Sequence, residues 1–225
     1  MSTVTASVTG AEPQLSPAPP AGASVTPRSV VGDLWQALTP LQRGTFVALS
    51  SERAALRARL TDPRRRAPWA RHVLAMDDEC HRTATSSAVE PPVVVHERRG
   101  GLVMLVPHPL GLIALRADDR LPGRETGAAV TAALTAGNRM VVLLDESTPS
   151  QIMDYLERFT ACLPDGVLAV ASRHSPSPSP CDENPDAVMS LPDPDVPGTA
   201  DLDAFRRWDK VPFRGELGMP KGVHP

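Results

Sequence analysis

Three thiols are the candidates for covalent chemistry in this sequence of 225 residues. A cysteine attacks as its thiolate, which forms beside a positive charge, a metal or a helix N-terminus. Cys162 falls late in a predicted helix, where a small buried core residue is the simpler interpretation. Cys181 follows a Ser-Pro repeat, and the nearby Glu183 has the wrong charge to activate it. With Cys80 the cysteines are odd in number and lack paired spacing, so we predict a reduced, cytoplasmic protein with no catalytic thiol.

Metal-ligating side chains cluster once, at Asp77, Asp78, Cys80 and His81. One Cys and one adjacent His cannot together build a tetrahedral site, and no second ligand pair has suitable spacing. We therefore interpret this cluster as a helix end and predict no metal.

Charge and hydropathy exclude two classes of partner. The formal charge of −3 gives no basic excess for a nucleic acid backbone. The run Arg64 to Arg66 lies between prolines and is typical of a solvated connection. No apolar stretch approaches the roughly 20 residues that span a bilayer. Residues 1–30 are rich in Ser, Thr, Pro, Ala and Gly without a charged start, which predicts a disordered arm and no signal peptide.

Two helical regions precede the strands. Apolar residues recur at helical spacing over residues 31–60, and we expect that face to pack inward while Arg53, Arg57 and Arg59 lie on the solvated side. The face comprises Leu34, Leu38, Leu41, Phe46, Leu49, Leu56 and Leu60. Thr39 is a predicted cap, with Pro40 at the first helical position. A further helix is predicted over 68–83, with Trp69, Val73 and Met76 packing on the two helices expected within residues 31–60, one through Leu38 and one from about Leu41.

A parallel sheet is predicted in the second half of the chain. Residues 90–106 are typical of strand, turn and strand. A strand over 110–115, an Ala-rich helix over 128–136 and a strand over 140–144 form a βαβ unit, with Gly137-Asn138 as a left-handed stop. A helix from Thr148 to Phe159 and a strand over 166–171 extend it. The fold class is thus α/β, a small Rossmann-like parallel core with N-terminal helices and disordered termini.

Regular structure is predicted to end at Ser172, which divides the chain into an arm (1–30), an α/β domain (31–172) and a Pro-rich linker with a C-terminal tail (173–225). Within the last segment we expect a short strand over 187–191 and a short helix over 202–208. Residues 213–225 have no periodicity and are predicted to dock on another surface.

The middle of the chain resembles the aldehyde dehydrogenase superfamily. The matching pieces, in order, are Pro109-Leu-Gly-Leu-Ile, Ala133-Leu-Thr-Ala-Gly-Asn, Val141-Val-Leu-Leu-Asp-Glu-Ser-Thr-Pro149 and Leu163-Pro-Asp-Gly-Val. Together they cover about a quarter of the chain. The resemblance implies a dehydrogenase cofactor domain that binds NAD or NADP, with a nucleophilic cysteine in a separate domain.

The departures from the family pattern fall on its functional positions. Asp118-Asp119-Arg120 replaces the family's Pro-Trp-Asn turn, whose Asn stabilises an oxyanion. Leu143 stands where the family has a lysine for the adenine ribose, and only Glu146 survives from that cluster, as a vestigial cofactor-binding residue. The family's Gly-rich phosphate turn and general base find no match beyond Val170. The resemblance therefore predicts no cofactor, although weak binding of NAD or NADP stays open.

Three hypotheses follow. The first is a truncated, non-catalytic dehydrogenase-like scaffold or accessory subunit, with a full-length dehydrogenase as its protein partner. The second is a cofactor half-site of a split NAD(P)-dependent oxidoreductase, completed by another chain. The third is a generic βαβ module that binds a small molecule. The sequence leaves the partner's identity and the oligomeric state open.

Overall fold

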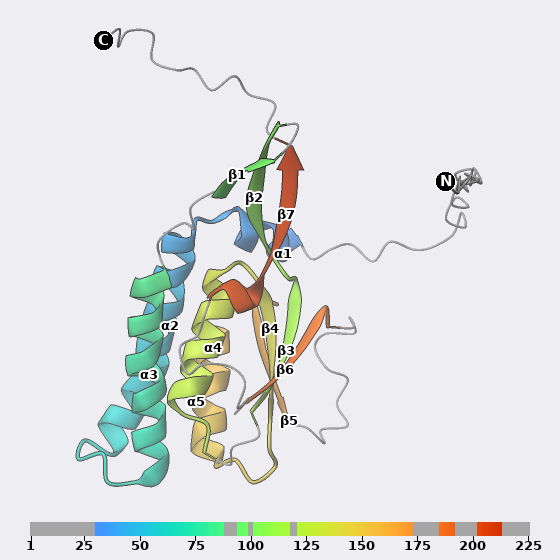
Figure 1. Cartoon of the computed structure of the whole chain (residues 1–225). Helices are drawn as coiled ribbons and strands as arrows, with labels where there is room; N and C mark the ends of the chain where they lie inside the picture. Colours follow the sequence, from blue (N-terminus) through green and yellow to red (C-terminus); the bar gives the residue numbers. More distant parts are fainter. Residues whose placement is uncertain are drawn as a thin grey trace, which may run out of the picture.

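The structure, a computed structural model, describes residues 30–87, 94–98, 101–117, 121–172, 185–191 and 202–212. Its elements, in chain order, are α1 (Val30–Ala37), α2 (Pro40–Thr61), α3 (Pro68–Ser87), β1 (Val94–Arg98), β2 (Gly101–Pro109), β3 (Leu112–Ala117), α4 (Arg124–Thr135), β4 (Arg139–Leu144), α5 (Ser150–Ala161), β5 (Leu168–Ser172), β6 (Ala187–Leu191), the 3₁₀ helix η1 (Leu202–Phe205) and β7 (Arg206–Pro212) (Figure 1). None of the described helices is long and apolar enough to cross a membrane.

A parallel sheet with strand order β5-β4-β3-β6 forms the centre of the fold. β3 pairs with β4 from Leu112–Arg139 to Ala117–Leu144. The elements β3, α4, β4, α5 and β5 therefore form two consecutive βαβ units, which confirms the predicted α/β class. In Figure 1 the helices α2 to α5 lie on the same side of this sheet.

A second sheet is antiparallel and has the order β1-β2-β7. The two strands predicted over 90–106 are confirmed as β1 and β2, which pair from Val94–Leu105 to Arg98–Gly101, while residues 99–100 between them lie outside the described residues. β7 adds to the other edge of β2, from Val103–Pro212 to Pro109–Arg206. The short helix predicted over 202–208 is thus only partly right: η1 ends at Phe205, and Trp208 lies in a strand.

Regular structure continues beyond the predicted end at Ser172. The short strand predicted over 187–191 is confirmed as β6, and it joins the parallel sheet next to β3, from Ile113–Ala187 to Ala117–Leu191. β6 and β7 pair with strands far away in the sequence, and local composition cannot predict such pairing. Several predictions fall on residues that the structure does not describe. These are residues 1–29 of the predicted arm, residues 118–120 in place of the family's Pro-Trp-Asn turn, Cys181, and the tail over 213–225.

The first two helices form where they are predicted. Thr39 caps α2: its Oγ1 accepts a hydrogen bond from the Gln42 amide at 3.2 Å, and the Gln42 side chain accepts one from the Thr39 amide at 2.9 Å. Pro40 occupies the first turn, where its missing N–H costs nothing. This reciprocal capping box fixes the start of α2.

The predicted buried face of α2 is wrong. Leu41, Leu49, Leu56 and Leu60 are 53–73% exposed, and Phe46 is 48% exposed. The buried residues of α2 are mostly small, among them Gly44, Val47, Ser51, Ala54, Ala55 and Ala58. Close helix approach explains the inversion, because a Cβ on Gly44 would lie 3.1 Å from the Ala84 carbonyl oxygen of α3. Arg53, Arg57 and Arg59 are exposed, as predicted.

α3 is longer than predicted and continues to Ser87. Val73 and Met76 are buried, which confirms the predicted packing face. Asp77, Cys80 and His81 lie in the middle of this helix, so their interpretation as a helix end is wrong.

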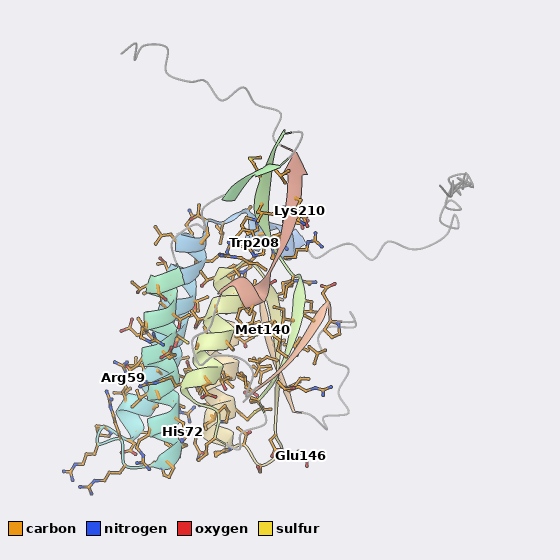
Figure 2. The ribbon with its side chains drawn as sticks, in the orientation of Figure 1. Arg59, His72, Met140, Glu146, Trp208 and Lys210 are labelled. Carbon is orange, nitrogen blue, oxygen red and sulfur yellow. The ribbon has the colours of Figure 1, made fainter. Side chains whose placement is uncertain are left out.

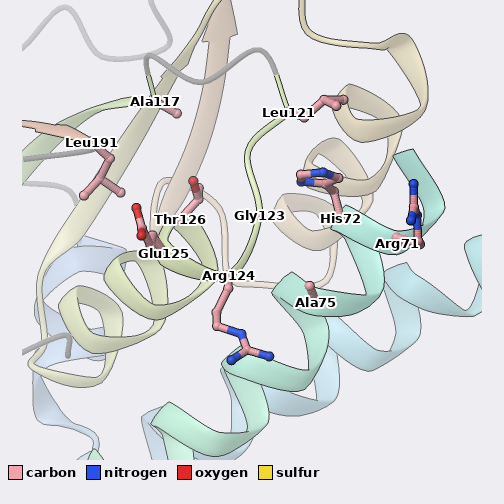
Figure 3. A pocket seen from close by; sticks show the side chains of 10 residues that line it. All are labelled: Arg71, His72, Ala75, Ala117, Leu121, Gly123, Arg124, Glu125, Thr126 and Leu191. Carbon is pink, nitrogen blue, oxygen red and sulfur yellow. The ribbon is translucent and has the colours of Figure 1, made fainter. Parts of the chain in front are cut away.

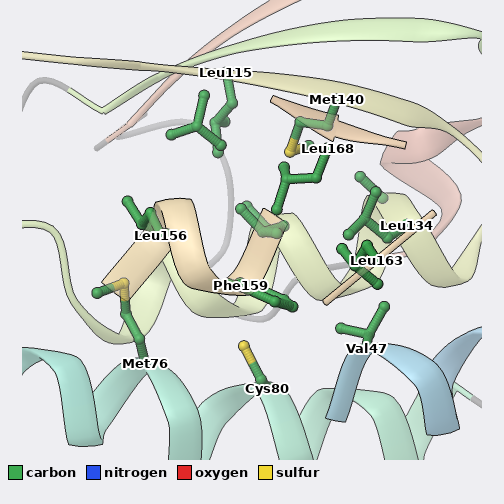
Figure 4. Packing of buried hydrophobic residues seen from close by; sticks show 14 of the residues in the cluster. Val47, Met76, Cys80, Leu115, Leu134, Met140, Leu156, Phe159, Leu163 and Leu168 are labelled. Atoms are coloured by element: carbon green, nitrogen blue, oxygen red, sulfur yellow. The ribbon is translucent and has the colours of Figure 1, made fainter. Parts of the chain in front are cut away.

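Beyond its first two residues, α4 is buried between the sheet and the outer helices. Every residue from Thr126 to Thr135 is buried. A Cβ at Gly127 would lie 2.7 Å from the Met76 carbonyl oxygen, so only glycine allows α3 to approach this closely. Figure 4 shows the resulting core, in which α4 and α5 contribute side chains between those of the sheet and those of α2 and α3: Leu115, Met140 and Leu168 from the sheet, Leu134, Leu156 and Phe159 from α4 and α5, and Val47, Met76 and Cys80 from α2 and α3.

The C-terminal end of α4 is held by two side chains from the N-terminal helices. Trp35 Nε1 donates to the Leu134 carbonyl at 3.1 Å. Arg43, only 6% exposed, donates from Nε to the Thr135 carbonyl at 2.8 Å and from Nη1 to the Gln36 carbonyl at 3.2 Å. Arg43 therefore caps α4 and the end of α1 together, and its charge complements both helix dipoles.

The stop after α4 takes the predicted conformation. Gly137 has φ of +96°, in the left-handed region. Asn138 is fully buried and fixes three segments: its Nδ2 donates to the Ala133 and Phe205 carbonyls, and its Oδ1 accepts from the Gly111 amide. The Gly-Asn pair thus joins α4, η1 and the start of β3.

We predict that Gly137→Val lowers the free energy of unfolding by about 1 kcal/mol or more, because a β-branched residue is strained at this φ. Urea denaturation measures the change. Gly137→Asn is the matched control and should lose less, since Asn tolerates the left-handed region. An unchanged midpoint for the valine variant would contradict the assigned role of this turn.

Candidate functional site

The candidate site is a crevice at the carboxyl ends of β3 and β6. The chain leaves β3 to α4 and β4 on one side, while β6 pairs on the other, so the strand order reverses here. Open α/β sheets bind ligands at such a reversal. The crevice has a volume of about 530 Å³. Its lining residues come from the two strand ends, the first turn of α4 and the first turns of α3: Ala117, Leu191, Leu121, Gly123, Arg124, Glu125, Thr126, Arg71, His72 and Ala75 (Figure 3).

The first turn of α4 is open toward this crevice. Gly123 stands at the N-cap and supplies no side-chain hydrogen bond to the helix. A Cβ there would lie 3.0 Å from His72 Nδ1, so glycine lets the His72 ring approach the helix start. Thr126 is 4% exposed, and its hydroxyl makes no hydrogen bond within the described part of the chain. This end of α4 therefore offers polar groups to a small ligand.

Charges of both signs border the crevice. Arg124 Nε lies 3.8 Å from the buried Glu79 carboxylate of α3. Arg71 and Glu125 form no ion pair within the described residues. In Figure 3, Glu125 and Thr126 lie on the side of Ala117 and Leu191, while His72 and Arg71 lie on the side of α3.

The predicted cofactor residue Glu146 lies in an exposed turn after β4. It is at the same end of the molecule as His72 (Figure 2). Its neighbour Asp145 binds within the same turn: its Oδ1 accepts from the Ser147 amide at 2.8 Å and from the Ser147 hydroxyl at 2.6 Å. Leu143 is half-buried on β4 and provides no cation. The residues present therefore do not fit the adenine ribose of NAD well, because the family's lysine is replaced by an uncharged side chain that donates no hydrogen bond.

Neither described thiol lies at the crevice. Cys162 follows the C-terminal end of α5, which is the opposite end of the sheet, because α5 begins after the carboxyl end of β4 and ends before the amino end of β5. It is half-buried rather than the fully buried core residue predicted. Cys80 is 1% exposed in the layer between α3 and α4, where its Sγ lies 3.7 Å from the Gly127 carbonyl.

Burial has a clear electrostatic effect on Cys80. Removal of the thiolate from water, together with the nearby Asp77 carboxylate, raises the pKa of Cys80 to about 11, against the opposing effect of hydrogen bonds with Thr131, Ser51 and Tyr155. A thiol with this pKa is protonated at neutral pH. Cys80 is therefore a core residue and not a nucleophile.

A buried polar network, which the sequence analysis missed, surrounds Cys80. Asp77 is fully buried; Oδ1 accepts from the Ser51 hydroxyl at 2.8 Å, and Oδ2 accepts from Arg59 Nη2 at 2.6 Å. Ser51 Oγ also lies 2.9 Å from the Tyr155 hydroxyl. The network joins α2, α3 and α5. The signal was present, since Asp77 lies four residues after Val73 and three before Cys80, on the buried face of α3.

No group of three His, Cys, Asp or Glu side chains placed to hold a metal ion occurs in the part of the chain that the structure describes. The Asp77, Asp78, Cys80 and His81 cluster instead divides between the core and the surface of α3. His81 Nδ1 lies 2.9 Å from the Asp77 carbonyl oxygen within the same helix.

Comparisons with known proteins show the fold. No protein-family model matches the sequence, and no curated protein sequence matches it. Lactaldehyde dehydrogenase from Escherichia coli superposes with a TM-score of 0.53 at 19% identity over 64% of this chain and 32% of its own. An NAD-dependent aldehyde dehydrogenase from Sinorhizobium meliloti gives 0.51 at 18% over 61% of this chain and 29% of its own. An NAD-dependent benzaldehyde dehydrogenase from Corynebacterium glutamicum gives 0.52 at 14% over 64% and 33%.

These likenesses give the chain an aldehyde dehydrogenase-like fold over nearly two thirds of its length. The chain spans about a third of the length of these dehydrogenases. The fold resemblance inferred from the sequence is confirmed, and it is wider than the quarter of the chain on which the matching residues lie.

We predict that alkaline pH destabilises the protein through Cys80. Its pKa is raised from 9.0 to about 11 by folding, so stability is full below about pH 9 and falls as the pH rises toward 11. The loss amounts to up to roughly 3 kcal/mol. The pKa of Tyr155 is also raised, mainly by burial, and adds loss in the same direction.

Urea denaturation at pH 8 and at pH 10.5 measures this effect. Cys80→Ala is the control: it should be less stable at pH 8 because of the small cavity, but should lose less stability on going to pH 10.5. Equal losses in the two proteins would contradict the assignment to Cys80.

Proposed function

We propose that this chain is a non-catalytic aldehyde dehydrogenase-like protein that acts as a scaffold or accessory subunit. The observation that carries the proposal is the position of its described thiols. The crevice where a ligand would bind has none, since Cys80 is sealed beneath α4 and Cys162 lies at the other end of the sheet. Aldehyde oxidation by covalent catalysis needs a thiolate beside the bound substrate.

The connection between β6 and β7 supports the same proposal. The resemblance implies a nucleophile in a separate domain, but only residues 192–205 join the last parallel strand to β7. β7 then pairs with β2 and completes the antiparallel sheet. No separate domain is inserted between these two strands.

The partner surface we favour is the second face of the parallel sheet. Parallel sheets are normally covered on both faces. The helices α4 and α5 pack against one face, and on the other Leu112, Val141 and Ala169 are already buried, with Leu143 half-buried beside them. On the neighbouring edge strand β6, Val188 is 54% exposed. The exposed apolar surface on this face therefore lies at the β6 edge, where a strand unpaired on one side within the described residues favours contact with a protein partner such as a full-length dehydrogenase.

A cofactor half-site, completed by another chain, is the second candidate function. The crevice at the strand reversal favours it, because that is where Rossmann-like folds hold nucleotides. Leu143 counts against it, because it supplies no cation where the family has a lysine for the adenine ribose. The third hypothesis, a generic βαβ module, is weaker, because the likeness to the dehydrogenases extends beyond the βαβ units.

We predict that the purified chain binds NAD more weakly than millimolar, measured by calorimetric titration. Leu143→Lys is the matched variant: under the cofactor half-site hypothesis it should tighten binding, whereas under the non-catalytic proposal it should change little. A dissociation constant in the low micromolar range, about −8 kcal/mol, would contradict the non-catalytic proposal.

A further inference from the structure

α2 carries apolar side chains that the described part of the chain leaves largely exposed. We call this the leucine stripe: Leu49, Leu56 and Leu60, extended by Phe46 and Leu41 toward the helix start. Their exposed fractions are 59%, 53%, 73%, 48% and 60%. The stripe lies opposite the buried side of α2, on which Val47, Ala54 and Ala58 face the other helices.

An exposed leucine is ordinary when it occurs singly, but a contiguous stripe is not. α2 places its small residues inward and its large apolar residues outward, so the stripe contributes little to the core of the single chain. Burying each leucine in an interface would stabilise the complex, because apolar surface would be removed from water. The stripe therefore has the character of a helix-packing surface.

We propose that the leucine stripe binds a second copy of this chain through an antiparallel pair of α2 helices. Leu49, Arg53, Leu56 and Leu60 follow at intervals of four, three and four residues. This is the seam spacing of paired helices, and it is the same in both directions. A two-fold axis midway between positions 53 and 56 sets Leu49 level with Leu60 of the partner subunit, and Arg53 level with Leu56 of the partner subunit.

The charges beside the stripe fit this arrangement on one flank. In an antiparallel pair equivalent flanks meet, so Glu52 comes within a turn of Arg59 of the partner subunit. Glu52 makes no ion pair within the described part of its own chain. Arg59 already binds Asp77 at 2.6 Å, but its side chain is 43% exposed and its guanidinium has further N–H donors.

Within the seam, Arg53 introduces a charge repulsion that provides a further test. Arg53 and its symmetry mate lie only about 4.5 Å apart along the helix axis, given a rise of about 1.5 Å per residue. Their aliphatic stems can pack on leucine while the guanidinium groups repel each other. Arg53→Leu should consequently strengthen the pair rather than weaken it.

Sedimentation analysis of the full chain over a range of concentrations tests the proposal. We expect a monomer–dimer equilibrium that Leu56→Glu weakens by roughly a hundredfold or more, because the two-fold interface loses two leucines at once. Arg53→Leu should tighten it. Val188→Glu, an equally exposed apolar residue on β6, is the control and should leave self-association unchanged.

Disulfide cross-linking in a Cys162→Ser and Cys181→Ser background tests the register. A chain carrying both Leu49→Cys and Leu60→Cys should form a covalent dimer under mild oxidation. Leu60→Cys alone should not, because the two copies of position 60 lie about 16 Å apart along the axis, beyond the roughly 7 Å reach of a disulfide.

A monomer at every concentration would overturn the proposal, and so would a dimer that Leu56→Glu leaves intact. Cross-linking through Leu60→Cys alone would indicate parallel helices and would equally overturn it. The proposal is independent of the proposed function, since it concerns α2 and not the sheet face on which the partner contact was placed.

Discussion

The burial of α4 on all sides is the constraint on which the rest of the structure depends. A helix between a sheet and a second helix layer must be narrow, and α4 meets this requirement with glycine, alanine and threonine. Gly127 allows the backbone of α3 to approach to a distance that any Cβ would prevent. The outer helix α2 follows the same rule and turns its small residues inward. The exposed leucines of α2 are the direct consequence, because the space between the helices has no room for them.

The same constraint positions both ends of α4. Its first turn opens on the crevice between β3 and β6, where Gly123 accommodates His72 and the Thr126 hydroxyl has no partner within the described chain. Its last turn is fixed by Trp35, Arg43 and Asn138. The hydrogen-bonded network of Asp77, Ser51 and Tyr155 joins the outer helices α2 and α3 to α5. Among the residues that the structure describes, no thiol lies beside this crevice.

Helix boundaries could be predicted from the sequence, whereas the buried face of a helix and the pairing of distant strands could not. Thr39-Pro40 marked the start of α2, and Gly137-Asn138 marked the end of α4, because both depend on local backbone chemistry. The buried face of α2 was predicted wrongly, since hydrophobicity alone cannot show that the helix spacing admits only alanine and glycine. β7 was missed because Trp208 and its neighbours gain their pairing from β2, about a hundred residues earlier. Glu146, the residue predicted to bind a cofactor, does not line the crevice, whereas its lining residues Thr126, His72 and Gly123 come together only through the fold.

We propose that the dehydrogenase-like core of this chain serves contact with another protein rather than chemistry of its own. Affinity purification of the chain from its native host tests that claim most directly, with the Val188→Glu chain as a parallel bait. The account predicts that a complete aldehyde dehydrogenase co-purifies with the unaltered chain in near-equal amount and is lost from the variant. Recovery of the unaltered chain without any dehydrogenase, or equal recovery of one with both baits, would contradict it.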